Sequence, residues 1–461
     1  MEEQYPKPKY PPLRTISKEE MIKRIKTYII DIQEPIPDAL TKNPRGHVPL
    51  YDFGKGDKIL VVGATEYDPE VINGYAEAIR QKGAKADLLL LDIGRLGSPE
   101  AASAEEAKSL IVGEDNPVYT KYSNVISSAT AKALALSEGY DMIVAGMGPP
   151  PHNVSLKWRR LMFVYGEEIA GDRVEFPLEL QLAIDRKVWE DLTSLEKCHF
   201  TDPEGTDFVW TNYDDERRMA IGHEFAKPMY IGHGGVPDCS GTIAGTLNHV
   251  GCYPNIRATV KNDLVVKVEG GGEYGDAWRA KLEELNGLEL PEAPVGGTDK
   301  TYKLPGPGYF WFYEMAIGTS PKVFRHPKEV NFECFASFLH DRERSGYVHH
   351  GMGAPSGTQP TYTRLGIPWS HVHIHSLFGT LEGRSRNGER TTVINKGHLT
   401  ALDDPEVRST ASRYGDPDKL LKEIWIPAIP GINEEGDYWQ DYAKNPSEWI
   451  RKEGERYIRV E

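Results

Sequence analysis

The feature that most constrains the fold is a series of short, continuously apolar segments in the first 200 residues, with helical segments between them. Lys58–Ala64, Ala86–Asp92 and Asp141–Gly148 have the length and composition of strands that are buried on both faces. The segment 68–82, between the first two, has apolar residues at helical spacing and begins with Asp-Pro, a typical helix start. Buried strands that alternate with helices predict a parallel sheet covered on both sides.

The pattern changes after about residue 197. Gly, Pro and Asn recur between short β-rich segments such as Ile256–Val260 and Leu264–Glu269, which Lys261-Asn-Asp joins as a hairpin turn. A helix over 178–195 is expected to close the first part, and another over 274–285 lies in the second. We predict three regions, namely an α/β domain with an N-terminal arm (1–197), a β-rich α+β metal-binding domain (198–384), and a C-terminal extension (385–461) that wraps over the surface or a neighbouring subunit.

Composition excludes several functions. The 461 residues carry a formal charge of −15, which argues against nucleic acid as a partner. No apolar run approaches the length of a membrane span, and the first residues lack the apolar core of a signal peptide. The four cysteines show no CxxC spacing, so we expect a cytoplasmic protein without a disulfide framework. The glycines after the strands, Gly63 and those in 146–152, lack phosphate-binding spacing, so we assign no nucleotide cofactor.

Histidines are the most informative residues for function. Seven of the 14 fall within 50 positions, namely His326, His340, His349, His350, His371, His373 and His375. On a strand, the alternation in 371–375 places three imidazoles on one face. The outer two are about 13 Å apart, so one adjacent pair that includes His373 is expected to bind a metal, with the third imidazole beside it. His326 lies in a basic turn and is expected on the surface.

Two further segments supply candidate ligands. His349 and His350 are neighbours in a glycine-bracketed segment, so one of them points to the site if the chain is extended there. Glu314 stands alone in an aromatic and apolar run, where a buried carboxylate needs a cation or a hydrogen-bond partner. A metal ion is one such partner, and an arginine is the other.

Five segments in this order resemble the motifs of a known superfamily: Thr201–Asp207, Val265–Glu273, Glu314–Pro321, Arg344–His349 and His373–Gly379. They are similar to motifs of the thermophilic metallopeptidase (aminopeptidase T, leucyl aminopeptidase) superfamily, which includes the iron-dependent 2,5-dihydroxypyridine 5,6-dioxygenases. The resemblance implies an N-terminal α/β domain, a β-rich domain that carries the metal, and a homodimer.

The resemblance also implies a ligand set of Glu314, His349, His373 and His375. This sequence departs from the aminopeptidase pattern at two positions. The segment 234–240 lacks the bridging Glu, and His375 stands where the aminopeptidases have Asp. Two adjacent ions need carboxylates to bridge them, so these departures favour one divalent metal ion per chain.

We therefore predict a mononuclear non-haem metal enzyme, with Fe(II) favoured and Zn or Mn as the other metals. The predicted activity is ring cleavage by a dioxygenase that acts on a hydroxylated aromatic or N-heterocyclic small molecule. His371 or His350 would act as acid–base or orient oxygen. The alternative is a zinc aminopeptidase or amidohydrolase, in which Tyr347 or Tyr362 steadies the intermediate. A third reading is an inactive relative whose C-terminal region mediates assembly.

Overall fold

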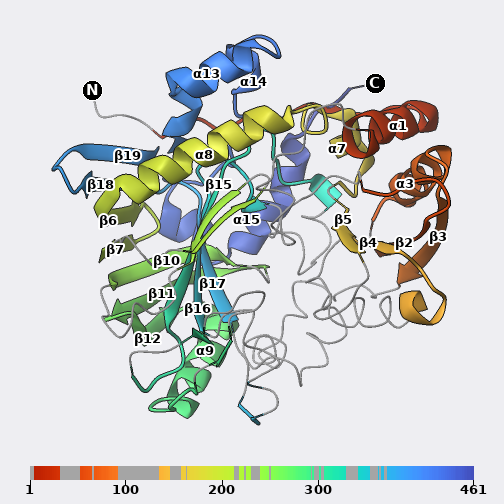
Figure 1. Ribbon diagram of the computed structural model, residues 1–461. Coiled ribbons are helices and arrows are strands. Elements are labelled where there is room, and N and C mark those ends of the chain that lie inside the picture. The colour runs from red at the N-terminus through yellow and green to blue at the C-terminus, as the bar shows by residue number, and fades with distance from the viewer. Residues whose placement is uncertain are drawn as a thin grey trace.

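The computed structural model describes residues 5–31, 52–64, 67–91, 134–145, 157–161, 163–211, 218–222, 225–229, 239–248, 251–291, 293–294, 301–302, 306–328, 341–353, 362, 365–367 and 371–460. Within these residues, no helix combines the length and apolar character that a membrane span requires. The chain forms two main sheets, a small one near the N-terminus and a large curled one that contains most of the later strands (Figure 1).

The small sheet is parallel, as the alternation of strands and helices predicts. Its order is β3–β2–β4–β5, with bounds Lys58–Ala64 (β2), Lys85–Leu91 (β3), Met142–Ala145 (β4) and Lys157–Arg160 (β5). The segment 146–152 lies outside the described residues. Strands β2 and β3 lie at the expected positions with a helix between them, so the expected order of strand, helix and strand between 58 and 91 is confirmed.

Helices pack against this sheet and against one another. They are α1 (Lys18–Ile25), its continuation η1 (Lys26–Ile30), α3 (Pro69–Gln81) and α7 (Gly166–Ala170). The side chain of Asp68 accepts a hydrogen bond from the Glu70 N–H, which caps α3 as predicted. Ile72 and Tyr75 of α3 are buried with Ile59 of β2, so the apolar face of the helix forms the core of this part.

The large sheet is antiparallel throughout and follows the order β20–β19–β18–β6–β7–β10–β17–β16–β15–β9–β8, with β11 and β12 continuing from β10. The bounds are Leu195–Asp202 (β6), Thr206–Thr211 (β7), Arg218–Gly222 (β8), Phe225–Met229 (β9), Ser240–Asn248 (β10), Gly251–Lys261 (β11), Leu264–Gly270 (β12), Phe312–Gly318 (β15), Val348–Gly353 (β16), His371–Ser376 (β17), Thr380–Ser385 (β18), Arg390–Asn395 (β19) and His398–Leu399 (β20). The predicted hairpin joins β11 and β12, with Asn262 and Asp263 both at positive φ. A separate two-stranded pair consists of β13 (Ala293–Pro294) and β14 (Thr301–Tyr302).

Helix α8 (Leu178–Ser194) forms as predicted, but it does not close the parallel-sheet part. Its buried residues Leu180, Ile184 and Val188 belong to the core of the large sheet, which α8 crosses in Figure 1. The reason is covalent, because β6 begins at Leu195, the residue that caps α8. Because no loop separates α8 from β6, the helix packs on the sheet to which β6 belongs. The other predicted helix is α9 (Gly272–Glu284), which contacts β11 and β12.

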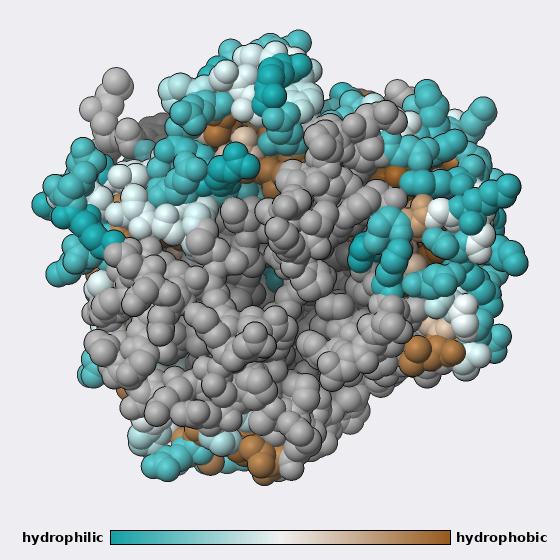
Figure 2. Space-filling model, in the orientation of Figure 1, coloured by the Kyte–Doolittle hydropathy of each residue, from teal (hydrophilic) through white to brown (hydrophobic). Residues whose placement is uncertain are grey.

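The C-terminal residues divide between the sheet and its cover. Strands β19 and β20, expected within the extension, lengthen the large sheet. The remaining elements are η3 (Thr400–Asp403), α13 (Pro405–Ser412), α14 (Pro417–Leu420), η4 (Tyr438–Tyr442), α15 (Pro446–Glu453), η5 (Gly454–Arg456) and β21 (Arg459–Val460). Strand β21 pairs in parallel with β1 (Leu13–Arg14), so the last strand of the chain lies beside a segment of the N-terminal arm. The described surface over α13 and α14 is mainly hydrophilic (Figure 2).

Buried charged side chains connect the two parts of the molecule. His326 is 2% exposed, so the expectation of a surface position is wrong. Its ring stacks on Tyr165, and its Nε2 lies 3.0 Å from Glu167 Oε2 of α7. Arg173 donates to Glu168 and also to Glu343, which lies just before β16. A histidine in a basic turn is buried here because a carboxylate 159 positions away pairs with it.

A second buried polar group joins the C-terminal cover to the large sheet. Glu204, in the turn between β6 and β7, accepts hydrogen bonds at 2.8 Å from the hydroxyls of Thr246 and Tyr438. Asn255 in turn donates to Tyr438. Burial and the nearby Asp202 carboxylate raise the pKa of Glu204 to about 8, and burial raises that of Asp202 to about 7. Below about pH 7, both carboxyls of this pair are therefore mainly protonated in the folded chain.

This raised pKa predicts a pH-dependent effect of Glu204→Gln. A carboxyl whose pKa is raised in the folded state contributes stability below its unfolded pKa, and this contribution is lost as the pH rises through about 8. Glutamine keeps an acceptor for Tyr438 and Thr246 and cannot ionise. We expect no gain at pH 5 and a gain of about 1 kcal/mol or more in the free energy of unfolding at pH 9, measured by urea denaturation. Glu196→Gln, at an exposed position of β6, is the control. Equal pH profiles for Glu204→Gln and the wild type would contradict the assignment.

Candidate metal centre

Three neighbouring strands, β15, β16 and β17, carry the predicted polar side chains on one face. Their register aligns Glu314, Gly351 and His373 in one row across the sheet. The next row contains Ala316, His349 and His375. Residues opposite one another in a sheet point to the same side, as do residues two apart on a strand. The register therefore places one glutamate and three histidines on a single face.

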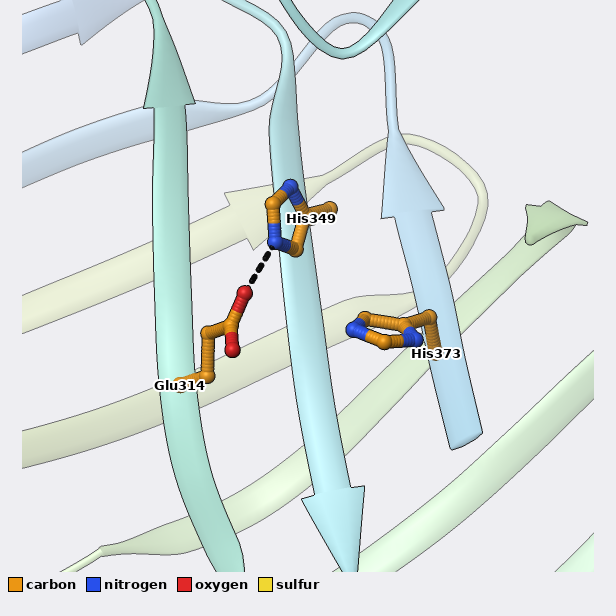
Figure 3. A group of neighbouring side chains, drawn as sticks. All are labelled: Glu314, His349 and His373. Atoms are coloured by element: carbon orange, nitrogen blue, oxygen red, sulfur yellow. Dashed lines mark hydrogen bonds and ion pairs between the residues drawn. The ribbon is translucent and has the colours of Figure 1, made fainter. Parts of the chain in front are cut away.

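Three of these side chains converge closely enough to hold one ion. Single ligand atoms of Glu314, His349 and His373 all lie within 4.8 Å of one another, and the three residues come from three adjacent strands (Figure 3). The Nε2 atom of His349 is 2.5 Å from Glu314 Oε1. All three residues are at most 2% exposed. Among the described residues, this is the group of three or more His, Cys, Asp or Glu side chains whose ligand atoms lie within 4.8 Å of one another.

The structure separates the two neighbouring histidines of β16. His350 lies in a row with Met315 and Ile374, on the face opposite to His349. Its ring packs at 5.1 Å from that of Phe200, and its Nδ1 donates to the Ile374 carbonyl oxygen at 3.3 Å. Burial lowers the pKa of His350 to about 3, so the ring is neutral in the core. The ring of Phe312 packs against that of His350 in the core of the large sheet, so Phe312 also points away from the candidate metal centre.

His375 lies beside the group of three but outside it. Its ring centroid is 5.8 Å from that of His349 and 6.2 Å from that of His373. The hydroxyl of Tyr347, itself fully buried, is 2.7 Å from His375 Nδ1. Burial, followed by the charge of His349, lowers the pKa of His375 well below its usual value. Burial, followed by the nearby Asp341 carboxylate, raises the pKa of Tyr347 well above 10. Both groups are therefore neutral, and Tyr347 touches His375.

Small residues make this close arrangement possible. Gly351 lies between Glu314 and His373 in the first row, and Ala316 lies beside His349 at one end of the second, so both rows leave room on this face of the sheet. Gly245 of β10 permits the approach of β10 to β17, because a Cβ there would lie 2.6 Å from the His375 carbonyl oxygen. No sequence motif indicates these three positions. The glycines inside the β-rich segments were the one available signal, because a glycine within a strand often marks a close approach of another backbone.

Several predicted residues are not tested by this geometry. The side chain of His371 and the segment 234–238, which includes Asp238, lie outside the described residues. Tyr362 is buried in the core of the large sheet, and its role in catalysis stays a prediction. His340 also lies outside the described residues. The assignment of ligands therefore rests on Glu314, His349 and His373.

The donor set fits a divalent transition metal. Two imidazole nitrogens and one carboxylate oxygen are borderline ligands that suit Fe, Zn and Mn, at distances of about 2.0–2.2 Å. An ion would also supply a positive charge beside the buried Glu314 carboxylate, which is hydrogen-bonded to His349. Three protein ligands, the number that the described residues provide, leave further coordination positions for a substrate. This arrangement is typical of catalytic rather than structural metal sites.

In comparisons with known proteins, the chain is similar to solved structures at low sequence identity. No protein-family model matches the chain, and no curated protein sequence matches it. The 2,5-dihydroxypyridine dioxygenase from Pseudomonas putida KT2440 is similar, with 12% identity over 83% of this chain and 98% of its own and a TM-score of 0.42. Wild-type AmpT from Thermus thermophilus is similar, with 15% identity over 83% of this chain and 99% of its own and a TM-score of 0.42.

The opposite directions of His349 and His350 give a matched pair of variants. We expect His349→Ala to weaken Zn²⁺ binding more than about 100-fold, because even the loss of a residue that only supports a ligand costs about 10- to 100-fold. His350→Leu removes the adjacent imidazole from the other face and should leave Zn²⁺ affinity unchanged. Isothermal titration of Zn²⁺ into each purified variant measures the difference. Equal losses in both variants would show that the face assignment is wrong.

Proposed function

We propose that the protein is a metal-dependent enzyme that holds one divalent ion with Glu314, His349 and His373. The observation that carries the proposal is the convergence of these three buried side chains from three adjacent strands. A structural role for the ion is less consistent with three protein ligands, because structural zinc sites are closed by four.

We further propose that the ion is Fe(II) and that the reaction is ring cleavage of a hydroxylated aromatic or N-heterocyclic substrate by a dioxygenase. Two histidines and one carboxylate on one side of an ion form the ligand type of non-haem Fe(II) oxygenases. The ion would supply redox chemistry and a position where substrate and oxygen meet. The chain itself would contribute burial, which keeps bulk water from the reacting groups.

The alternative is a zinc aminopeptidase or amidohydrolase. Its support is the same donor set, because two histidines and one glutamate also hold catalytic zinc in metallopeptidases. In that case the ion would activate water, and a nearby carboxylate or histidine would accept its proton. The two proposals differ in the metal, in the requirement for oxygen and in the substrate.

Metal analysis and oxygen uptake separate the two proposals. We expect protein purified without oxygen to contain one iron per chain, because the described site offers one carboxylate and no bridging partner for a second ion. We also expect oxygen consumption with hydroxylated aromatic or pyridine compounds and none with His373→Ala. Zinc together with hydrolysis of peptide or amide substrates would favour the alternative. Two ions per chain would contradict a mononuclear site.

A further inference from the structure

The hydrogen bond between Tyr347 and His375 determines which nitrogen of His375 carries a proton. Tyr347 is fully buried, and its phenol O–H is a hydrogen-bond donor. A buried O–H that makes no hydrogen bond is costly. His375 Nδ1, at 2.7 Å, is the acceptor that the described residues offer to this hydroxyl. Tyr347 therefore donates, and Nδ1 accepts with its lone pair.

The proton of His375 must then lie on the other ring nitrogen. A neutral imidazole carries one N–H, so a ring that accepts at Nδ1 has its hydrogen at Nε2. A metal ligand needs a lone pair instead. For His375 to bind an ion through Nε2, its hydrogen would have to move to Nδ1, and the Tyr347 hydroxyl would lose its acceptor. The hydrogen bond thus disfavours His375 as a fourth ligand.

The site geometry agrees with this reading. The ligand atoms that come together belong to Glu314, His349 and His373. His375 faces His349 directly across the β16–β17 pair, on the same side of the sheet. The His375 ring lies 5.8 Å from that of His349 and 6.2 Å from that of His373, so an N–H on this ring is within range of a molecule that the ion binds. Oxygen atoms of phenolates and carboxylates are strong acceptors for such a donor.

We infer that Tyr347 is a positioning residue that keeps the proton of His375 on Nε2, so that His375 donates a hydrogen bond to an oxygen of the bound substrate instead of coordinating the metal. This inference deepens the proposed function and depends on it for the substrate role. It assigns to His375 a different task from the one that the family resemblance implies. It also identifies the substrate class as one with an anionic or strongly accepting oxygen next to the ion.

The first test is nuclear magnetic resonance of protein labelled with ¹⁵N at histidine, before and after addition of Zn²⁺. In the metal-free wild type, we expect His375 to carry its hydrogen on Nε2, with the assignment made by comparison with His375→Gln. On addition of Zn²⁺, His349 and His373 should change as ligands do, while His375 keeps its N–H. A hydrogen on Nδ1 in the metal-free protein, or loss of the His375 N–H on Zn²⁺ binding, would overturn the inference.

The second test measures binding of 4-nitrocatechol, a hydroxylated aromatic, to the Zn²⁺-loaded protein. Tyr347→Phe should not weaken Zn²⁺ binding, and it should weaken 4-nitrocatechol binding about tenfold, because the donor is no longer oriented. His375→Leu should do the same, and His375→Gln, which retains an N–H donor, should restore part of the loss. Unchanged 4-nitrocatechol binding in both Tyr347→Phe and His375→Leu would refute the donor role. If Tyr347→Phe does not fold, the comparison of the two His375 variants decides.

The two tests distinguish this inference from the proposed function. If no histidine responds to Zn²⁺, the proposed metal enzyme is wrong, whereas the tautomer measured in the metal-free protein still decides the effect of Tyr347. If His349, His373 and His375 all respond as ligands, the metal site stands and the inference about His375 fails.

Discussion

The pairing of β16 between β15 and β17 is the constraint on which the rest of the structure depends. Because side chains alternate along a strand, one register sends Glu314, His349 and His373 to one face and Met315, His350 and Ile374 to the other. The second set joins the core of the large sheet. A slip of one residue in β16 would bury His349 in that core and direct His350 toward Glu314. The burial of the apolar row therefore also maintains the candidate metal centre.

The C-terminal region supports this sheet from the side of the candidate site. Tyr347, which touches His375, is buried in a cluster with Leu247 of β10 and with Tyr438 and Tyr442 of η4. The hydroxyl of Tyr442 also lies 3.1 Å from that of Thr246, which donates to Glu204. These contacts make the C-terminal segment part of the surroundings of His375. A change in η4 can thus influence the site without touching a ligand.

The sequence predicted what depends on local pattern. Alternating apolar strands and helices indicated the parallel sheet, and the spacing in 371–375 placed His373 and His375 on one face. It did not predict contacts between distant segments. Glu204 and Tyr438 are 234 positions apart, and nothing near either residue indicates the other. The burial of His326 has the same explanation, since its partner Glu167 belongs to the other part of the molecule. The choice between His349 and His350 depended on the register of β16, which the sequence alone left open.

The charge balance of the site favours an acidic substrate. Glu314 offers one negative charge, and both histidine ligands are neutral when they coordinate, so a divalent ion would leave a net charge of about +1. Burial strengthens electrostatic interactions, so this charge would attract an anionic oxygen more strongly than a neutral carbonyl. A hydroxylated aromatic ring that loses a proton on binding would neutralise the site, whereas a peptide bond would not. A donor at His375 would act in the same direction, because a phenolate oxygen accepts a hydrogen bond more strongly than an amide oxygen. Both considerations are consistent with the proposed dioxygenase, while in the hydrolase alternative a hydroxide on the ion would balance the same charge.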